Sequence, residues 1–186
     1  ADSADYKAAV AMIEKTLPEF EQLMWGGVDA ITMTSLVMRG RAYFLQGKYK
    51  EAIKELDYNP EVFDEFDEAF QKQGNLAQAP GAEKRLWLGK SHMALADKAT
   101  ERKEKIDNYL TALKKYVAIL KKFPGYGKSD EAYANMMLCK EHLEKVTGKP
   151  VQLPPIAPPT KSAAKAAVAE VKIPEEAEQL FKEKKF

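Results

Sequence analysis

Residues 36–56 read LVMRGRAYFLQGKYKEAIKEL, and the fold that we expect follows from this stretch. Before Gly47 the apolar side chains recur at helical spacing. After it they fall at i, i+3, i+4 and i+7, so the pattern predicts two amphipathic helices joined at that glycine. Gly40 costs about 1 kcal/mol of helix propensity inside the first helix. Close packing of the two helices at Gly40 and Ala52 is the compensation that we expect.

The same stretch resembles the tetratricopeptide repeat (TPR), whose signature is W-x2-L-G-x2-Y, then A-x3-F and then P. The matching positions hold Gly40, Tyr43, Ala52 and Leu56. Leu36 stands in place of the first Trp, and Arg39 in place of the Leu before the glycine. The resemblance implies an antiparallel helix pair that stacks on further pairs.

Further copies of the pattern follow along the chain. The second copy consists of Leu88-Gly89-x2-His92, then Tyr109-x2-Ala112-x3-Tyr116, then Pro124. Its halves are separated by the polar segment 96–108, which we expect either to lengthen the helix pair or to form a solvated loop. A half-copy opens the chain at Tyr6-x2-Ala9-Val10, and residues 129–146 resemble the first helix of another repeat. The sequence of residues 123–148 is similar to sequences of TPR proteins of the bacterial cell envelope.

We therefore predict an all-α fold in two parts: a short TPR-like solenoid of antiparallel helix pairs over residues 1–148, and an extended Pro/Ala-rich tail over residues 149–186. Residues 149–160 hold five of the ten prolines, which predicts a semi-rigid polyproline strap. A short C-terminal helix follows, with acidic residues first and basic residues last. We expect the tail to dock through Leu180, Phe181 and Phe186, either on its own solenoid or on a neighbour.

Local signals also place helix ends. Residues 73–81 contain Gly, Asn and Pro and indicate a loop, so the next helix is expected to begin at Glu83. The helix that carries Gly40 is expected to begin at Thr34 or the following serine, or further upstream near Asp29. Ser129 is the predicted N-cap of the last helix, and Gly148 its predicted stop.

Composition bounds the classes of function. The net charge of +1 over 186 residues argues against electrostatic binding to nucleic acid or to a membrane surface. No apolar run reaches the about 18 residues that a membrane span needs. The chain begins at Ala1 without an initiating Met, which suits a mature chain after signal-peptide removal, with a trimmed chain as the alternative. We favour an exported, periplasmic location over a cytoplasmic one.

The sequence lacks the motifs that mark common catalytic sites. It has no Gly-rich phosphate loop, no G-x-S-x-G, no H-E-x-x-H and no C-x-x-C. Cys139 and His142 lie three residues apart, but a structural zinc site needs about four ligands. The single cysteine permits no internal disulfide and is interpreted as a small core residue. We therefore expect no enzyme activity, no cofactor and no metal, with an enzyme of unfamiliar type as a minor alternative.

The TPR resemblance implies a ligand groove, lined by the first helix of each pair near its glycine. The groove positions carried over from the family are Thr34, Val37, Met38, Arg41 and Leu45 in one copy, and Glu83, Leu86, Trp87, Lys90 and Met93 in the other. Val37 and Leu86 stand where the family's carboxylate clamp uses Lys. An apolar groove remains, with Arg41 and Lys90 as its cations, which suits an apolar or mildly acidic peptide or helix. Trp87 is the expected main contact if it is exposed; for every one of these residues, core packing is the alternative.

These inferences predict a non-catalytic scaffold or adaptor that organises a larger protein assembly. It would hold other proteins through the groove and the docking tail, as a homo-oligomer or as part of a hetero-complex. No nucleic-acid partner is expected. The alternative is an accessory, non-catalytic subunit or an assembly factor of a redox or envelope enzyme complex.

Overall fold

The computed structural model describes residues 7, 8, 10–13, 15, 30–57, 79–123 and 125–159. In these ranges the regular structure is helical and includes no β-strand, which confirms the all-α class. The main helices are α2 (Ala30–Leu45), α3 (Tyr49–Leu56), α5 (Pro80–Lys98), α6 (Arg102–Lys122) and α7 (Ser129–Thr147). None of the described helices combines the length and apolarity that crossing a bilayer requires. The predicted docking residues Leu180, Phe181 and Phe186 lie outside the described ranges.

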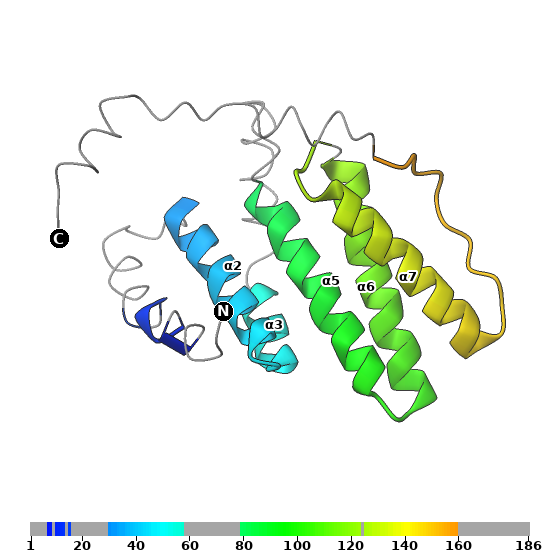
Figure 1. The fold of residues 1–186 in the computed structure, drawn as a ribbon, viewed down its shortest axis with the longest axis horizontal. Helices are drawn as coiled ribbons and strands as arrows, with labels where there is room; N and C mark the ends of the chain where they lie inside the picture. Colours follow the sequence, from blue (N-terminus) through cyan, green and yellow to red (C-terminus); the bar gives the residue numbers. More distant parts are fainter. Residues whose placement is uncertain are drawn as a thin grey trace.

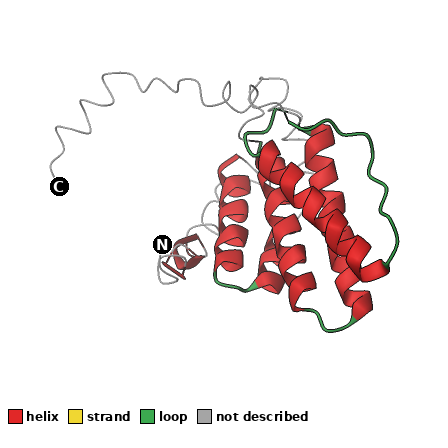
Figure 2. Ribbon diagram, turned by 45° about the vertical axis from the view of Figure 1, so that its right-hand side comes forward, coloured by secondary structure: helices red, strands yellow, loops and turns green. Residues whose placement is uncertain are grey.

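The helices lie side by side in two layers (Figure 1). Helices α2, α5 and α7 form one layer and run in the same direction; we call them the α2–α5–α7 row. Helices α3 and α6 lie behind this row and run the opposite way, so α3 is antiparallel to α2, and α6 is antiparallel to both α5 and α7. In the second layer α3 packs against both α2 and α5, and α6 packs against both α5 and α7. Figure 2 shows the same layers turned by 45°, with short loops between α2 and α3 and between α5 and α6.

Each predicted glycine contact joins the two helices of a pair. A Cβ atom on Gly40 would overlap the side chain of Leu56 in α3. A Cβ atom on Gly89 would lie 2.6 Å from Cζ of Tyr116 in α6, which is also too close. The prediction that both glycines lie at close helix contacts is confirmed. A side chain at either position forces the helices apart or displaces the partner side chain.

Two hydrophobic clusters meet at α5. The first lies between α2, α3 and α5 and contains Met33, Leu36, Val37, Leu56, Trp87 and Leu88. The second lies between α5, α6 and α7, with Leu86, Tyr116 and Met136 among its buried members. Helix α5 therefore has one apolar face toward α2 and α3 and another toward α6 and α7. This is why buried residues occur on several sides of α5.

The described part of the strap, residues 150–159, covers the second cluster. Val151, Leu153 and Ile156 pack against it. The Val151 N–H donates a hydrogen bond of 2.9 Å to Oε1 of Glu144, which ties the start of the strap to α7. From there the strap returns alongside α7 toward the end where that helix begins (Figures 1 and 2).

The helix ends agree with the sequence in part. Gly148 ends α7 in the left-handed conformation, with φ of 70°, as predicted. Segment 96–108 lengthens the α5–α6 pair, since only residues 99–101 separate the two helices.

Two predicted helix starts are wrong. Helix α5 begins at Pro80 and not at Glu83, because proline needs no hydrogen-bond acceptor for a backbone N–H in the first turn. Ser129 is the first residue of α7 and not its N-cap; its hydroxyl donates to the carbonyl oxygen of Tyr126 at 2.7 Å. Helix α2 begins at Ala30, upstream of Thr34 and close to the alternative start at Asp29.

Candidate functional site

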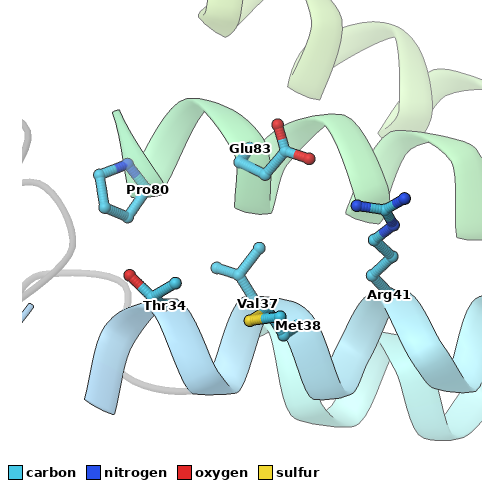
Figure 3. Close-up of a pocket in the computed structure, with 6 residues that line it drawn as sticks. All are labelled: Thr34, Val37, Met38, Arg41, Pro80 and Glu83. Carbon is cyan, nitrogen blue, oxygen red and sulfur yellow. The ribbon is translucent and has the colours of Figure 1, made fainter. Parts of the chain in front are cut away.

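A small pocket lies between α2 and α5 and has a volume of about 110 Å³ (Figure 3). Its lining residues, which define the α2–α5 pocket, are Thr34, Val37, Met38, Arg41, Pro80 and Glu83. The four from α2 fall at i, i+3, i+4 and i+7, which places them on one side of that helix. The two from α5 belong to its first turn. The pocket therefore forms where two helices of the α2–α5–α7 row meet.

The wall formed by α2 is mainly apolar. Val37 is buried and Met38 is 56% exposed, so together they form an apolar surface that runs from the core to the solvent. Pro80 faces them from α5 (Figure 3). A flexible thioether such as that of Met38 adapts its shape to a partner surface.

Arg41 supplies the positive charge of the α2–α5 pocket. Its side chain extends from α2 toward α5 (Figure 3), and its Cζ atom lies 5.2 Å from the centroid of the Trp87 ring. This geometry is a cation–π contact. Within the described part of the chain, no carboxylate forms an ion pair with Arg41. The Trp87 ring thus holds the guanidinium in place, and no described carboxylate neutralises it.

Trp87 provides the aromatic ring that the Arg41 guanidinium contacts. The residue is only 6% exposed, and its ring centroid lies 5.3 Å from that of Phe44 in α2. Its Nε1–H donates a 2.8 Å hydrogen bond to Glu83. The ammonium of Lys90 lies 4.2 Å from the same ring. Little of the Trp87 surface reaches solvent, so core packing, the alternative expected for this residue, describes it and not a direct ligand contact.

The carboxylate of Glu83 is already bound by donors from other residues of the chain. Its carboxylate points away from α2 (Figure 3) and accepts hydrogen bonds from Trp87, from the hydroxyl of Tyr126 and from the ammonium of Lys128. Burial alone would raise the pKa of Glu83, but the hydrogen bonds from Lys128, Tyr126 and Trp87 outweigh it and hold the pKa below its usual value. The carboxylate is therefore ionised and turned toward the α6–α7 loop, and among the described residues that line the pocket Arg41 is the only cation.

The structure divides the groove residues expected from the sequence into two groups. Thr34, Val37, Met38, Arg41 and Glu83 line one pocket. The other expected residues do not line it. Leu86 is fully buried and Leu45 is half-buried. Met93 accepts a hydrogen bond of 3.2 Å at its Sδ atom from the hydroxyl of Tyr116. Lys90 forms an ion pair with Glu131 of α7. Pro80 was missed because residues 73–81 were assigned to a loop; a proline just ahead of an apolar helical pattern is the signal that places it in a first turn.

Two further polar clusters of the described chain belong to the packing between helices. Tyr109 donates a hydrogen bond to Asp97 and stacks on His142, with 5.0 Å between the ring centroids. Burial raises the pKa of the neighbouring Cys139 to about 12, so its thiol is protonated and unreactive at neutral pH. His92 forms a 2.9 Å hydrogen bond with Asn108, and burial lowers the pKa of its ring.

No three His, Cys, Asp or Glu residues of the described ranges are grouped as metal ligands would be. Comparison with known protein families, with curated proteins and with solved structures finds no match for this chain. Function is therefore inferred from the helix packing and from the α2–α5 pocket.

Proposed function

We propose that the chain is a TPR-like, non-catalytic scaffold that holds a segment of another protein at the α2–α5 pocket. The observation that carries this proposal is the pairing of an exposed apolar wall with an arginine that no described carboxylate neutralises. An apolar side chain of the partner would fill the pocket, and a carboxylate beside it would bind Arg41. Such a segment is recognised by contact and charge, with no chemical step.

Support for the TPR-like assignment comes from the glycine contacts. Gly40 meets Leu56, and Gly89 meets Tyr116. In each pair a glycine of the first helix receives a large side chain of the second, four residues after an alanine, as in the A-x3-F part of the family signature. The α2–α5–α7 row then corresponds to the first helices of successive repeats, the side on which such solenoids bind their ligands.

Pocket size favours a peptide side chain over a metabolite. Small-molecule sites usually have volumes of about 300–1,000 Å³. The α2–α5 pocket, at about 110 Å³, is smaller than that range. It accommodates one apolar side chain, and the remaining affinity has to come from the surrounding helix surface. This is how an amphipathic helix or an extended peptide binds in a groove.

The stacking of Arg41 on Trp87 favours binding of a carboxylate. A free arginine loses about 2 kcal/mol of rotamer entropy when it is fully immobilised. Contact with the Trp87 ring restricts the side chain beforehand, so less entropy remains to be lost on binding. A planar guanidinium also binds a carboxylate through two parallel hydrogen bonds. An acidic partner residue is therefore preferred to a neutral one.

The test is selection from a displayed library of random peptides against the full chain. We expect enriched peptides to carry an acidic residue next to an aliphatic or aromatic one. Arg41→Gln should weaken their binding about fivefold, because an exposed ion pair contributes up to about 1 kcal/mol. Lys103→Gln is the matched control, since it removes one exposed positive charge from α6, outside the pocket.

Two outcomes contradict the proposal. One is the absence of enriched peptides. The other is equal weakening by Arg41→Gln and Lys103→Gln, which would mean that the overall charge of the chain and not the α2–α5 pocket attracts the peptides.

A further inference from the structure

We propose that the chain's own residues 174–186 occupy the α2–α5 pocket within the same molecule and compete there with segments of other proteins. This inference rests on the proposed function, because it concerns the same pocket. It adds a named occupant and a form of self-inhibition. We call residues 174–186 the C-terminal segment.

The C-terminal segment has the chemistry that the pocket selects. It reads PEEAEQLFKEKKF, so Glu175, Glu176 and Glu178 stand next to Leu180 and Phe181. An apolar side chain from this group fits beside Val37 and Met38, and an acidic one reaches Arg41. The preceding residues 160–173 read TKSAAKAAVAEVKI, with three lysines, one glutamate and no aromatic residue. They do not combine an acidic cluster with a large apolar side chain, so the C-terminal segment is the part of the tail that fits.

The strap brings the chain to the correct end of the helix row. It returns alongside α7 from the end of that helix to the level of its first turn (Figure 1). Helices α2, α5 and α7 run in the same direction, and the pocket includes Pro80 and Glu83 from the first turn of α5. The packing of Val151, Leu153 and Ile156 holds the strap on this route. The tail therefore starts at the end of the row where the pocket lies.

The remaining chain is long enough to reach the pocket. Fourteen residues, 160–173, lie between the described strap and the C-terminal segment. They span at most about 50 Å when extended. The distance from α7 across α5 to α2 is two helix spacings, or about 20 Å. A tether of this kind gives an effective concentration in the millimolar range, so a weak contact suffices for occupancy.

The outer face of α7 is nearer to the strap but fits the segment less well. Met137 and Leu138 are 41% and 44% exposed there, beside an open hollow of about 520 Å³. The lysines at this face are already neutralised on their own helix, Lys140 by Glu144 at 2.9 Å and Lys145 by Glu141 at 2.7 Å. Neither of these two lysines is free to bind a glutamate of the segment, whereas Arg41 has no carboxylate partner in the described chain.

Cysteine cross-linking in the full chain tests the proposal. One variant carries Met38→Cys with Phe181→Cys, and the matched control carries Met137→Cys with Phe181→Cys. Both methionines are exposed, while the native Cys139 is fully buried and stays out of the reaction. With a short bismaleimide at low protein concentration, we expect a monomeric cross-link that forms about tenfold faster in the Met38 variant than in the control. Adding Arg41→Gln should slow it several-fold, and adding Lys103→Gln should leave it unchanged.

Three results would overturn the proposal. Equal rates in the two variants would mean that the tail samples the surface without a preferred site. A faster reaction at Met137→Cys would place the segment on α7. A cross-linked dimer as the main product would mean that the segment binds a neighbouring molecule.

The library selection separates this inference from the proposed function. If the C-terminal segment competes for the pocket, Leu180→Ser with Phe181→Ser in the full chain should strengthen peptide binding several-fold. Peptides that bind equally well with and without these changes would end the inference and leave the proposed function standing. If no peptide binds even to the double variant, the proposed function fails as well.

Discussion

Helix α5 contacts α2 along one side and α7 along the other, and the two junctions are closed by different chemistry. The α5–α7 junction is crossed by the Lys90–Glu131 ion pair, and Glu83 binds both Tyr126 and Lys128 from the loop that leads into α7. The α2–α5 junction is crossed by the contact of Arg41 with Trp87 and has an apolar pocket beside it. The difference agrees with the proposal that the α2–α5 junction binds a partner and that the α5–α7 junction holds the helices together.

The largest effect on the free energy of unfolding is expected from substitutions at the two glycine contacts. One contact lies between α2 and α3 and the other between α5 and α6, so the two substitutions compare these helix pairs directly. Tyr116 is fully buried in the 21-residue helix α6, and its hydroxyl is bonded to Met93. Leu56 is also buried, but it is the last residue of the 8-residue helix α3, and we expect so short a helix to shift more easily than α6. Gly89→Ala should therefore lower the free energy of unfolding by about 3 kcal/mol and Gly40→Ala by only about 1 kcal/mol, the overpacking cost less any gain in helix propensity.

Urea denaturation of both variants measures this difference. Val10→Ala is a useful reference, since it removes volume from a buried site outside either glycine contact. Equal losses of stability for Gly40→Ala and Gly89→Ala, or a larger loss for Gly40→Ala, would contradict the expectation that α6 is held more firmly than α3.

A smaller effect is expected from Glu83→Gln, which opens the polar network at the α5–α7 junction. The change keeps the size of the side chain but removes a carboxylate that accepts charge-assisted hydrogen bonds, so we expect a loss of about 2 kcal/mol at pH 7. The pKa of Glu83 is lowered in the folded state, so its stabilising contribution is present above the unfolded pKa of about 4.3 and is lost as the pH falls through the folded pKa.

The measurement is urea denaturation from pH 7 down to pH 3 in parallel with Glu101→Gln, a control at an exposed position. The difference in stability between the native chain and Glu83→Gln should shrink below about pH 4. A difference that does not change with pH would show that the ionised carboxylate is not what stabilises the junction.

The sequence predicted the parts of the fold that depend on local signals. Gly40 was placed at a helix contact because it lacks a side chain, Gly89 by its match to the repeat pattern, and Gly148 ended α7 as expected. The α2 side of the pocket was also predicted, from the TPR resemblance, which implied Val37, Met38 and Arg41 as groove positions. The period of the helix accounts for their lying on one side of α2.

The sequence could not predict which side chains pair across the helices. The bond from Lys128 to Glu83 joins residues 45 positions apart, and nothing local distinguishes Glu83 from the other glutamates. The burial of Trp87 depends in the same way on Phe44, which packs on it from another helix. Such contacts follow from the placement of whole helices, so equivalent repeat positions such as Arg41 and Lys90 were assigned the same role although only Lys90 is paired with a carboxylate of the described chain.

The smallest change in stability is expected for Arg41→Gln. This substitution is the most direct test of the difference between the α2–α5 and α5–α7 junctions. Arg41→Gln removes a cation that makes no ion pair with the described chain, so its effect on the free energy of unfolding should stay within about 0.5 kcal/mol. Lys90→Gln breaks the pair with Glu131 and should cost slightly more, about 0.5–1 kcal/mol. Peptide binding should respond in the reverse order, with a larger loss for Arg41→Gln than for Lys90→Gln. If Arg41→Gln instead destabilises the chain more than Lys90→Gln does, Arg41 is a structural residue, and the α2–α5 junction is closed as firmly as the junction with α7.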